Sequence, residues 1–213
     1  MCDGMYCLTD GSLRLLLKSR GLFTFDEYLK HLEFMPTYIA ILRGINVSGS
    51  KLLKMADLKS ALHAMGLDEV ETYIQSGNVK FSTSKSAPTK LAKGIEQMIN
   101  ETFGYEVPVI VLEKEDLESV TSSNPFLVKG DIDPKALYVT FLGEKPSPEK
   151  LRSLNEISSG DDEFKVINKT IYLYCPSGYG RTKLTNNLFE KKLGVTATSR
   201  NWKTVMKLLE MAS

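Results

Sequence analysis

The sequence predicts an α+β fold of two tandem βαββαβ subdomains with antiparallel sheets, related by an internal duplication. Apolar runs rich in β-branched residues, which are typical of buried strands, alternate with segments of helical periodicity. The same order of strands and helices occurs twice, and Gly, Pro and Asn separate the segments. A chain of 213 residues is long enough to give each subdomain a core of its own.

The first subdomain is predicted to open with a strand over 38–47, which is apolar and rich in β-branched residues. A helix is expected over 55–65, where apolar residues recur at helical spacing. Strands over 70–75 and 79–83 flank Ser76-Gly77-Asn78. This tripeptide favours a tight hairpin, because Gly and Asn tolerate a positive φ.

A second helix is predicted to begin at Pro88, which favours a first helical turn, and to end at Gly104, which favours a left-handed C-cap. A strand over 107–112 completes the βαββαβ order. A linker follows, with a short helical stretch over 117–120 and several turn residues.

The second subdomain repeats this order. A strand over 136–142 precedes a helix that Ser147 and Pro148 open. Strands over 164–167 and 170–175 form a hairpin that turns at Asn168-Lys169.

The second subdomain ends with a helix over 183–193, stopped by Gly194, and a strand over 196–200. Asn201 caps a terminal helix in which Trp202 is expected to be a core anchor. The domain organisation that follows is an N-terminal extension over 1–34, expected to be peripheral, a first subdomain with its linker helix over 35–120, a linker over 121–135 and a second subdomain over 136–213.

Composition excludes several classes of protein. The formal net charge of +1 lacks the strongly basic footprint of proteins that bind nucleic acid nonspecifically. Three cysteines without metal-ligand spacing, and two histidines, predict neither disulfides nor a metal site. No stretch is typical of a secretory leader or a membrane span. We therefore expect a soluble cytoplasmic protein with no metal, no cofactor and no membrane partner.

Four short stretches are richer in Gly, Asn, Arg and Thr than packing requires: 42–46, 73–79, 178–187 and 198–202. In combination they resemble the bacterial family known as domain of unknown function 1697 (DUF1697), essentially from Met35 to the C-terminus. The resemblance implies paired ferredoxin-like subdomains, which agrees with the order of the elements. It implies no particular activity.

Strand direction is expected to bring these stretches together. In a βαββαβ unit the first two strands run one way and the last two the other, so residues 43–46 and the turn at 76–78 share one edge. In the second subdomain, 178–185 and 200–201 also share an edge. If the two edges meet, one cleft between the subdomains holds the polar side chains. The residues predicted there are Arg43, Asn46, Gln75, Ser76, Asn78, Gly180, Arg181, Thr182, Lys183, Asn186, Arg200 and Asn201.

The chemistry of this cleft favours an anionic small molecule, phosphorylated or a nucleotide. Guanidinium groups match the geometry of phosphate and carboxylate, and amides supply neutral donors. Gly178-Tyr179-Gly180, which leads into a helix, also directs backbone N–H groups outward. The spacing of a P-loop is absent.

Structural roles explain the same residues equally well. Gly77 and Asn78 suit a tight hairpin whatever the function, and Gly180 is a natural loop hinge. Arg43, inside the apolar strand over 38–47, is expected to pair with a carboxylate at the subdomain interface. Cys175 is expected to be a small buried hydrophobe, since no histidine is placed to activate it.

Two other functions stay open. A single-stranded nucleic-acid-binding module would stack bases on one sheet face, where Tyr138, Tyr172 and Tyr174 are candidates. A structural protein that forms a homodimer would cover the second apolar face of the strand over 38–47, so both a monomer and a homodimer are considered. No Ser/His/Asp arrangement and no general base are evident, so the sequence assigns no catalytic residue.

Overall fold

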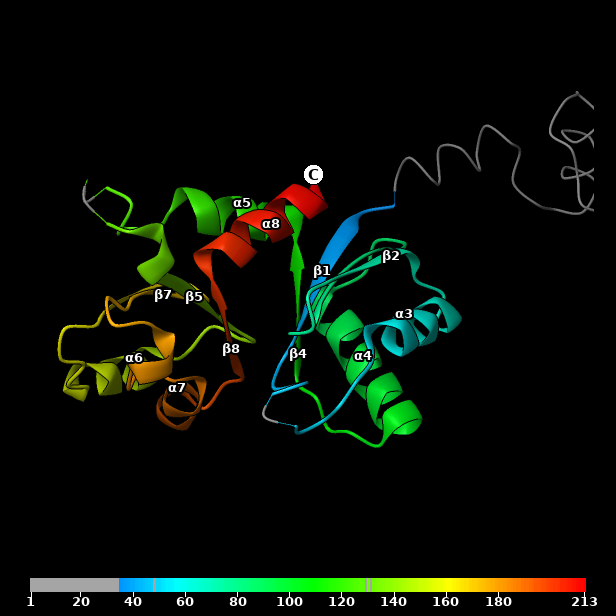
Figure 1. The fold of residues 1–213 in the computed structure, drawn as a ribbon, viewed down its shortest axis with the longest axis horizontal. Coiled ribbons are helices and arrows are strands. Elements are labelled where there is room, and N and C mark those ends of the chain that lie inside the picture. The colour runs from blue at the N-terminus through cyan, green and yellow to red at the C-terminus, as the bar shows by residue number, and fades with distance from the viewer. Residues whose placement is uncertain (1–34, 48, 129, 131) are drawn as a thin grey trace, which may run out of the picture. The chain divides into compact units, whose positions relative to one another are not determined.

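The computed structural model describes residues 35–47, 49–128, 130 and 132–213, so the expectation for residues 1–34 lies outside the described residues. Thr37–Ser213 form one compact unit. The elements of its first subdomain, shown in Figure 1, are β1 (Thr37–Leu42), α3 (Met55–Ala64), β2 (Asp68–Tyr73), β3 (Asn78–Ser82), α4 (Pro88–Phe103), β4 (Val109–Glu113) and α5 (Lys114–Ser122).

The second subdomain repeats this order after a short 3-10 turn (Pro134–Ala136). Its elements are β5 (Leu137–Leu142), α6 (Pro148–Arg152), a 3-10 helix (Ser153–Glu156), β6 (Glu163–Ile167), β7 (Thr170–Tyr174), a 3-10 turn (Tyr179–Arg181), α7 (Asn186–Leu193), β8 (Ala197–Asn201) and α8 (Trp202–Ala212). None of the helices in the described part of the chain is both long and apolar enough to cross a membrane.

Each subdomain has a four-stranded antiparallel sheet, with the order β2-β3-β1-β4 in the first and β6-β7-β5-β8 in the second. The predicted fold class of two tandem βαββαβ subdomains is therefore confirmed. Local signals in the sequence explain much of it. Gly104 adopts the left-handed conformation that ends α4, and the side chain of Asn201 accepts a hydrogen bond from Thr204 N to cap α8.

Several predicted boundaries differ from the structure, and two of them bear on the polar loops. β1 ends at Leu42, because Gly44 and Asn46 adopt positive φ and turn the chain out of the sheet before residue 47. α7 begins at Asn186 rather than at residue 183, because Thr185 is its N-cap and accepts a hydrogen bond from Leu188 N. Both changes lengthen the polar loops beside the sheet edges.

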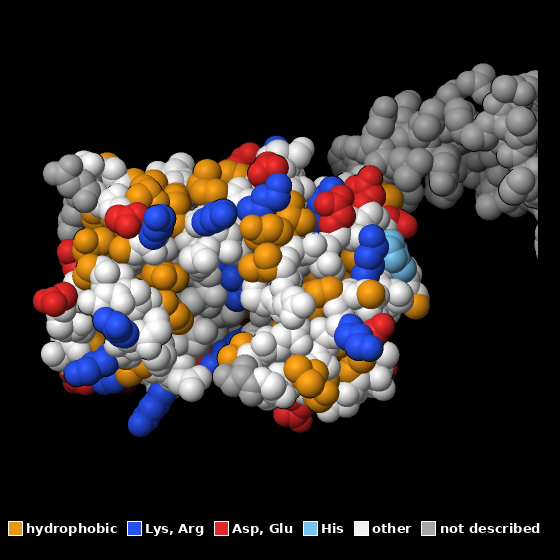
Figure 2. Space-filling view, viewed as in Figure 1, with side chains coloured by type: hydrophobic (Ala, Val, Ile, Leu, Met, Phe, Trp, Pro, Cys, Tyr) orange, Lys and Arg blue, Asp and Glu red, His pale blue; other side chains and the backbone are white. Residues whose placement is uncertain are grey.

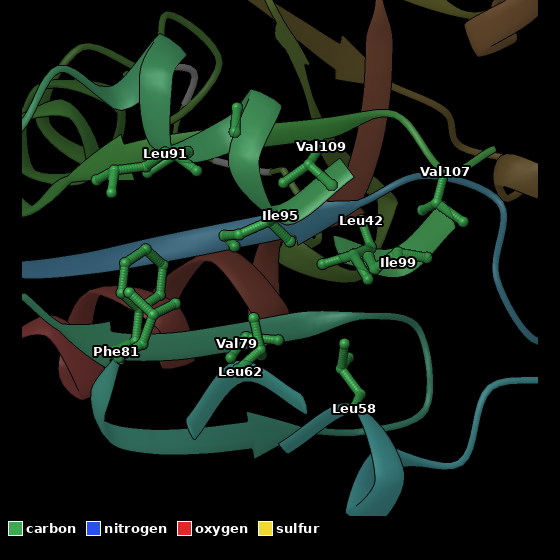
Figure 3. Close-up of a cluster of buried hydrophobic side chains, with 14 of the residues drawn as sticks. Leu42, Leu58, Leu62, Val79, Phe81, Leu91, Ile95, Ile99, Val107 and Val109 are labelled. Carbon is green, nitrogen blue, oxygen red and sulfur yellow. The ribbon is translucent and has the colours of Figure 1, made fainter. Parts of the chain in front are cut away.

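One face of the first sheet packs against α3 and α4 (Figure 3). Leu62 of α3 and Ile95 of α4 lie against the strands that carry Leu42 and Val79, and all four side chains are fully buried. Burying such aliphatic side chains stabilises a fold by about 1.5–3 kcal/mol each. This core fixes the ends of β1 and β3, where the polar loops begin.

The opposite face of the first sheet is covered by the second subdomain. Ile39 and Ile41 of β1 belong to a buried cluster with Val139 of β5, with residues of α5 and with Trp202 and Val205 of α8. Trp202 is therefore a core anchor, as predicted. The second apolar face of β1 is buried within the chain itself, so it does not require another copy of the protein to cover it.

The strand registers match the two subdomains position by position. Ile41 pairs with Asn78 in the first sheet as Phe141 pairs with Thr170 in the second. Likewise, Ile39 pairs with Leu112 as Val139 pairs with Arg200. Asn78 of the first subdomain thus corresponds to Thr170 of the second. Arg200 of the second corresponds to Leu112 of the first.

Backbone hydrogen bonds at the strand ends repeat in the same way. Leu42 N donates to Gly77 O (2.8 Å) as Leu142 N donates to Lys169 O (2.9 Å). Arg43 N donates to Pro108 O (2.9 Å) as Gly143 N donates to Thr196 O (2.9 Å). Arg43 therefore corresponds to Gly143. The two arginines, Arg43 and Arg200, thus correspond to a small residue, Gly143, and to an apolar residue, Leu112, of the other subdomain.

Candidate functional site

A cleft of about 430 Å³ lies between the two subdomains, where the predicted sheet edges meet. Figure 2 shows a hollow between the two halves of the molecule with Lys or Arg side chains inside it. The residues that line the cleft are Leu42, Arg43, Gly44, Ile45, Val47 and Ser76 from the first subdomain, and Tyr179, Thr185, Asn186, Asn187, Thr198, Ser199 and Arg200 from the second.

Arg200 lies at the bottom of this cleft and is only 9% exposed. Its guanidinium donates to five neutral oxygens within 3.0 Å: Asn78 Oδ1, Thr198 Oγ1, Ser199 O, Leu42 O and Ser76 O. Burial lowers the pKa of Arg200 to about 10, so the side chain stays protonated at neutral pH. No carboxylate of the described residues pairs with it, so its charge is hydrogen-bonded but not neutralised.

Arg43 crosses the cleft in the opposite direction, from the first subdomain to the second. Its Nε donates to Ala197 O at 2.8 Å, and its Nη2 donates to Asn187 Oδ1 and Glu190 Oε2, both at 2.6 Å. The predicted pairing of Arg43 with a carboxylate at the interface is therefore confirmed. Its Nη1 has no acceptor among the residues that the structure describes.

A chain of hydroxyl groups orients Asn186 at the N-terminus of α7. Tyr179 donates to Ser199 Oγ at 2.9 Å, and Ser199 donates to Asn186 Oδ1 at 2.6 Å. Burial raises the pKa of Tyr179, although the bond to Ser199 lowers it in part, so the phenol remains a neutral donor. Asn186 lines the cleft, and its Nδ2 group has no acceptor among the described residues.

The amide of Asn187 and the hydroxyl of Ser76 are fixed in a similar way. Asn187 Oδ1 accepts from Arg43, and Ser76 Oγ accepts from Asn78 Nδ2 at 3.0 Å. Each side chain therefore uses its acceptor within the protein and keeps a donor. With Arg43 Nη1 and Asn186 Nδ2, these groups give the cleft four donors that have no acceptor in the described part of the chain.

Of the residues that the sequence placed in the cleft, Arg43, Ser76, Asn186 and Arg200 line it, and Asn78 lies behind them, fully buried and bound to Arg200. The direction of the strands thus brings together side chains far apart in the sequence. The first-subdomain edge holds Arg43 and Ser76, and the second-subdomain edge holds Asn186 and Arg200.

The other predicted residues do not line the cleft. Asn46 holds its own loop through Leu53 and Gln75 O, Thr182 donates to Asp162, and Asn201 caps α8. The exposed residues Gln75, Gly180, Arg181 and Lys183 also lie outside it. The late start of α7 explains the positions of Gly180, Arg181 and Lys183, because the 3-10 turn Tyr179–Arg181 and the irregular residues after it precede the helix.

Several residues of the site were not predicted from the sequence. The polar stretches contain Tyr179, Asn187 and Ser199. Each is next to a predicted residue, Gly180, Asn186 and Arg200 respectively, and this neighbourhood could have identified them. Glu190 lies one helical turn beyond Asn186, on the same face of α7, but nothing in the sequence distinguishes it from other exposed carboxylates.

Cys175 is fully buried, and burial raises the pKa of its thiol to about 11. At pH 8 only roughly one thiol in a thousand is ionised at such a pKa, and the thiolate is the reactive form. With Cys2 and Cys7 replaced by serine, we expect Ellman's reagent to find no reactive thiol in the native protein and one after addition of urea. Rapid labelling of the native protein would contradict this prediction.

No group of three or more His, Cys, Asp or Glu side chains within the described ranges is arranged to hold a metal ion. A second cleft, of about 470 Å³, overlaps the corresponding position on the other side of the duplication, although its remaining wall is α5, which corresponds to α8 and not to α7. It is lined by Leu112, Leu142, Lys169 and Thr170, which correspond to Arg200, Leu42, Gly77 and Asn78. Among the described residues, a buried arginine lines the first cleft, and no arginine lines the second.

Comparison with known proteins gives a family and a fold. The model of the family described as "Protein of unknown function (DUF1697)" matches residues 35–172. No curated protein matches. The solved structure of the conserved bacterial protein SP0830 from Streptococcus pneumoniae is 24% identical, covers 84% of this chain and 99% of its own, and has a TM-score of 0.68, so the two share a fold. The family match covers most of the chain, which therefore belongs to the DUF1697 family.

Proposed function

We propose that this protein binds an anionic small molecule, phosphorylated or a nucleotide, in the cleft between its subdomains. The observation that carries the proposal is the set of four donors without acceptors: Arg43 Nη1, Asn186 Nδ2, Asn187 Nδ2 and the Ser76 hydroxyl. Phosphate and carboxylate groups are rich in acceptors and satisfy several donors at once. No lining residue is acidic.

The charge of Arg200 supports the same ligand class. A buried cation without a counterion is unfavourable, because desolvation is offset only by neutral hydrogen bonds. The fold does not require a cation at this position, since the corresponding residue of the first subdomain is Leu112, which packs in the core. A negative ligand in the cleft would supply the compensation that the described residues lack.

The shape of the site is compatible with a small molecule. Its volume of about 430 Å³ falls within the usual range for such sites, roughly 300–1,000 Å³. The N-terminus of α7 opens into the cleft through Thr185, Asn186 and Asn187, and the positive end of a helix dipole favours an anion. No catalytic group is assigned.

Two expectations favoured a nucleic-acid-binding module and a homodimer, and the structure supports neither expectation. Because Val139 pairs with Tyr172, Tyr138 lies on the opposite sheet face from Tyr172 and Tyr174, so the expectation that the three tyrosines share one face was wrong. The face with Tyr172 is buried in the core with α5 and α8. The apolar face that suggested a homodimer is covered within the chain. The proposal includes a cytoplasmic location, because an odd number of three cysteines is not typical of a disulfide-bonded secreted protein.

The test compares ligand binding by two variants that carry the same change of charge. Asn186→Asp keeps the oxygen that accepts from Ser199 but turns the free amide donor into a second carboxylate oxygen. Asn155→Asp makes the same replacement at an exposed position outside the cleft. We expect AMP to raise the melting temperature of the native protein and of Asn155→Asp by a few degrees, and to have no effect on Asn186→Asp.

A panel extends this test beyond one compound. It contains AMP, cyclic AMP, glucose 6-phosphate and inorganic phosphate, with adenosine and glucose as uncharged counterparts. The proposal fails if no anion of the panel stabilises the protein more than the uncharged compounds do. It also fails if Asn186→Asp responds to the anions as strongly as the native protein.

A further inference from the structure

We infer that the cleft selects a ligand group with a single negative charge, such as a phosphodiester, over a dianionic phosphate monoester. This inference rests on the proposed function and narrows its ligand class. It follows from three features of the site: the number of charges that remain uncompensated, the way in which Arg200 is held, and the way in which Glu190 is held.

The cleft offers one uncompensated positive charge. The titratable side chains that line it are Arg43, Arg200 and Tyr179, and the phenol of Tyr179 stays neutral. Arg43 forms an ion pair with Glu190 at 2.6 Å, so the two charges cancel. Of these lining side chains, Arg200 is the one cation that has no opposite charge among the described residues.

Arg200 cannot form a two-pronged contact with a phosphate, because its N–H groups are already directed at oxygens of the protein. Its charge acts across the low-dielectric bottom of the cleft without a direct bond. The ligand is therefore contacted mainly by neutral amide and hydroxyl donors. A second negative charge would lose its hydration and gain no cation, which is unfavourable.

Arg43 does not supply that second cation. Glu190 is held in place by its other oxygen, since Oε1 accepts from Ala197 N at 3.0 Å. If Arg43 turned to a dianion, the Glu190 carboxylate would remain beside the ligand without its partner. Repulsion between the carboxylate and the ligand would then offset the gain from the guanidinium.

The experiment uses AMP and adenosine 3′,5′-cyclic monophosphate, which differ in charge on the same skeleton. The second pKa of a phosphate monoester lies at about 6, so AMP changes from a monoanion to a dianion between about pH 5.5 and about pH 8, whereas the cyclic diester stays a monoanion. Isothermal titration calorimetry should show the affinity for AMP falling roughly tenfold or more as the pH rises. The affinity for the cyclic diester should stay constant, which also controls for titration of the protein.

Glu190→Gln gives an independent test, because it removes the charge that neutralises Arg43 but keeps an oxygen for Ala197 N. We expect this variant to bind dianionic AMP at about pH 8 roughly tenfold more tightly than the native protein does, with a smaller gain for the cyclic diester. Urea denaturation of both proteins establishes that the variant is folded.

The possible results separate the two proposals. AMP that binds equally well or better at the higher pH would overturn the inference and leave the proposed function intact. An unchanged preference in Glu190→Gln would also count against the inference. Binding of neither nucleotide at any pH would overturn the inference, and binding of no anion of the panel would overturn the proposed function as well.

Discussion

Alanine at position 77 is expected to lower the free energy of unfolding by roughly 2–5 kcal/mol. Gly77 has a φ of +76°, and a Cβ there would lie 2.7 Å from Leu42 Cβ and 2.8 Å from Ile45 Cδ1. The Ile45 methyl group is able to turn away, but Leu42 Cβ is fixed by the end of β1. Two penalties therefore add, a left-handed backbone and an overlap inside the core. Urea denaturation measures the sum.

A substitution at Gly66 measures the penalty of the left-handed backbone without the overlap in the core. Its φ of +84° is equally unfavourable for alanine, but a Cβ at this position has no atom within 4 Å. Gly66→Ala should therefore lower the free energy of unfolding by only about 1 kcal/mol. Equal losses for the two variants would mean that the contact with Leu42 is unimportant and that the turn at Gly77 needs glycine for its backbone alone.

Arg200→Ala is expected to lower the free energy of unfolding by about 3 kcal/mol. The substitution leaves Asn78 Oδ1, Leu42 O and Ser76 O without the donor that now serves them. Water that enters through the cleft replaces part of these bonds, which limits the loss. The same variant should show no thermal stabilisation by AMP, since the uncompensated charge of the cleft is gone.

The internal duplication supplies a control for this substitution. The double variant Arg200→Leu with Asn78→Thr copies the corresponding pair of the other cleft, Leu112 and Thr170. We expect it to recover at least half of the stability lost in Arg200→Ala, because an apolar side chain fills the site and a buried charge is removed. It should still fail to bind AMP. A double variant as unstable as Arg200→Ala would show that the fold itself depends on the arginine.

The elements that the sequence predicted best are those defined by local chemistry. Pro88 and Gly104 bound α4, and Asn201 caps α8, because each favours its conformation through its own backbone or side chain. The end of β1 was predicted too late, since apolar Ile45 continues the strand pattern while Gly44 and Asn46 turn the chain. Periodicity does not distinguish a buried loop residue from a strand residue.

The candidate site was predictable where topology alone determines position. Strand direction places Arg43 and Ser76 at one edge, and Arg200 at the other, whatever the details of packing. The partners of Arg200 were not predictable, because three of them are backbone carbonyls and every residue has one. The pairing of Arg43 with Glu190 was equally hidden, since many carboxylates in the chain are possible partners.

The difference between the two clefts reflects the covalent link between the repeated units. In a symmetric pair of identical chains one gene encodes both junctions, so a mutation that places an arginine in one places it in the other. Once both units are joined in a single polypeptide, each junction is free to mutate alone. One junction has Leu112 and its apolar packing, and the other has Arg200. The covalent link thus allows the two contacts to differ within one scaffold.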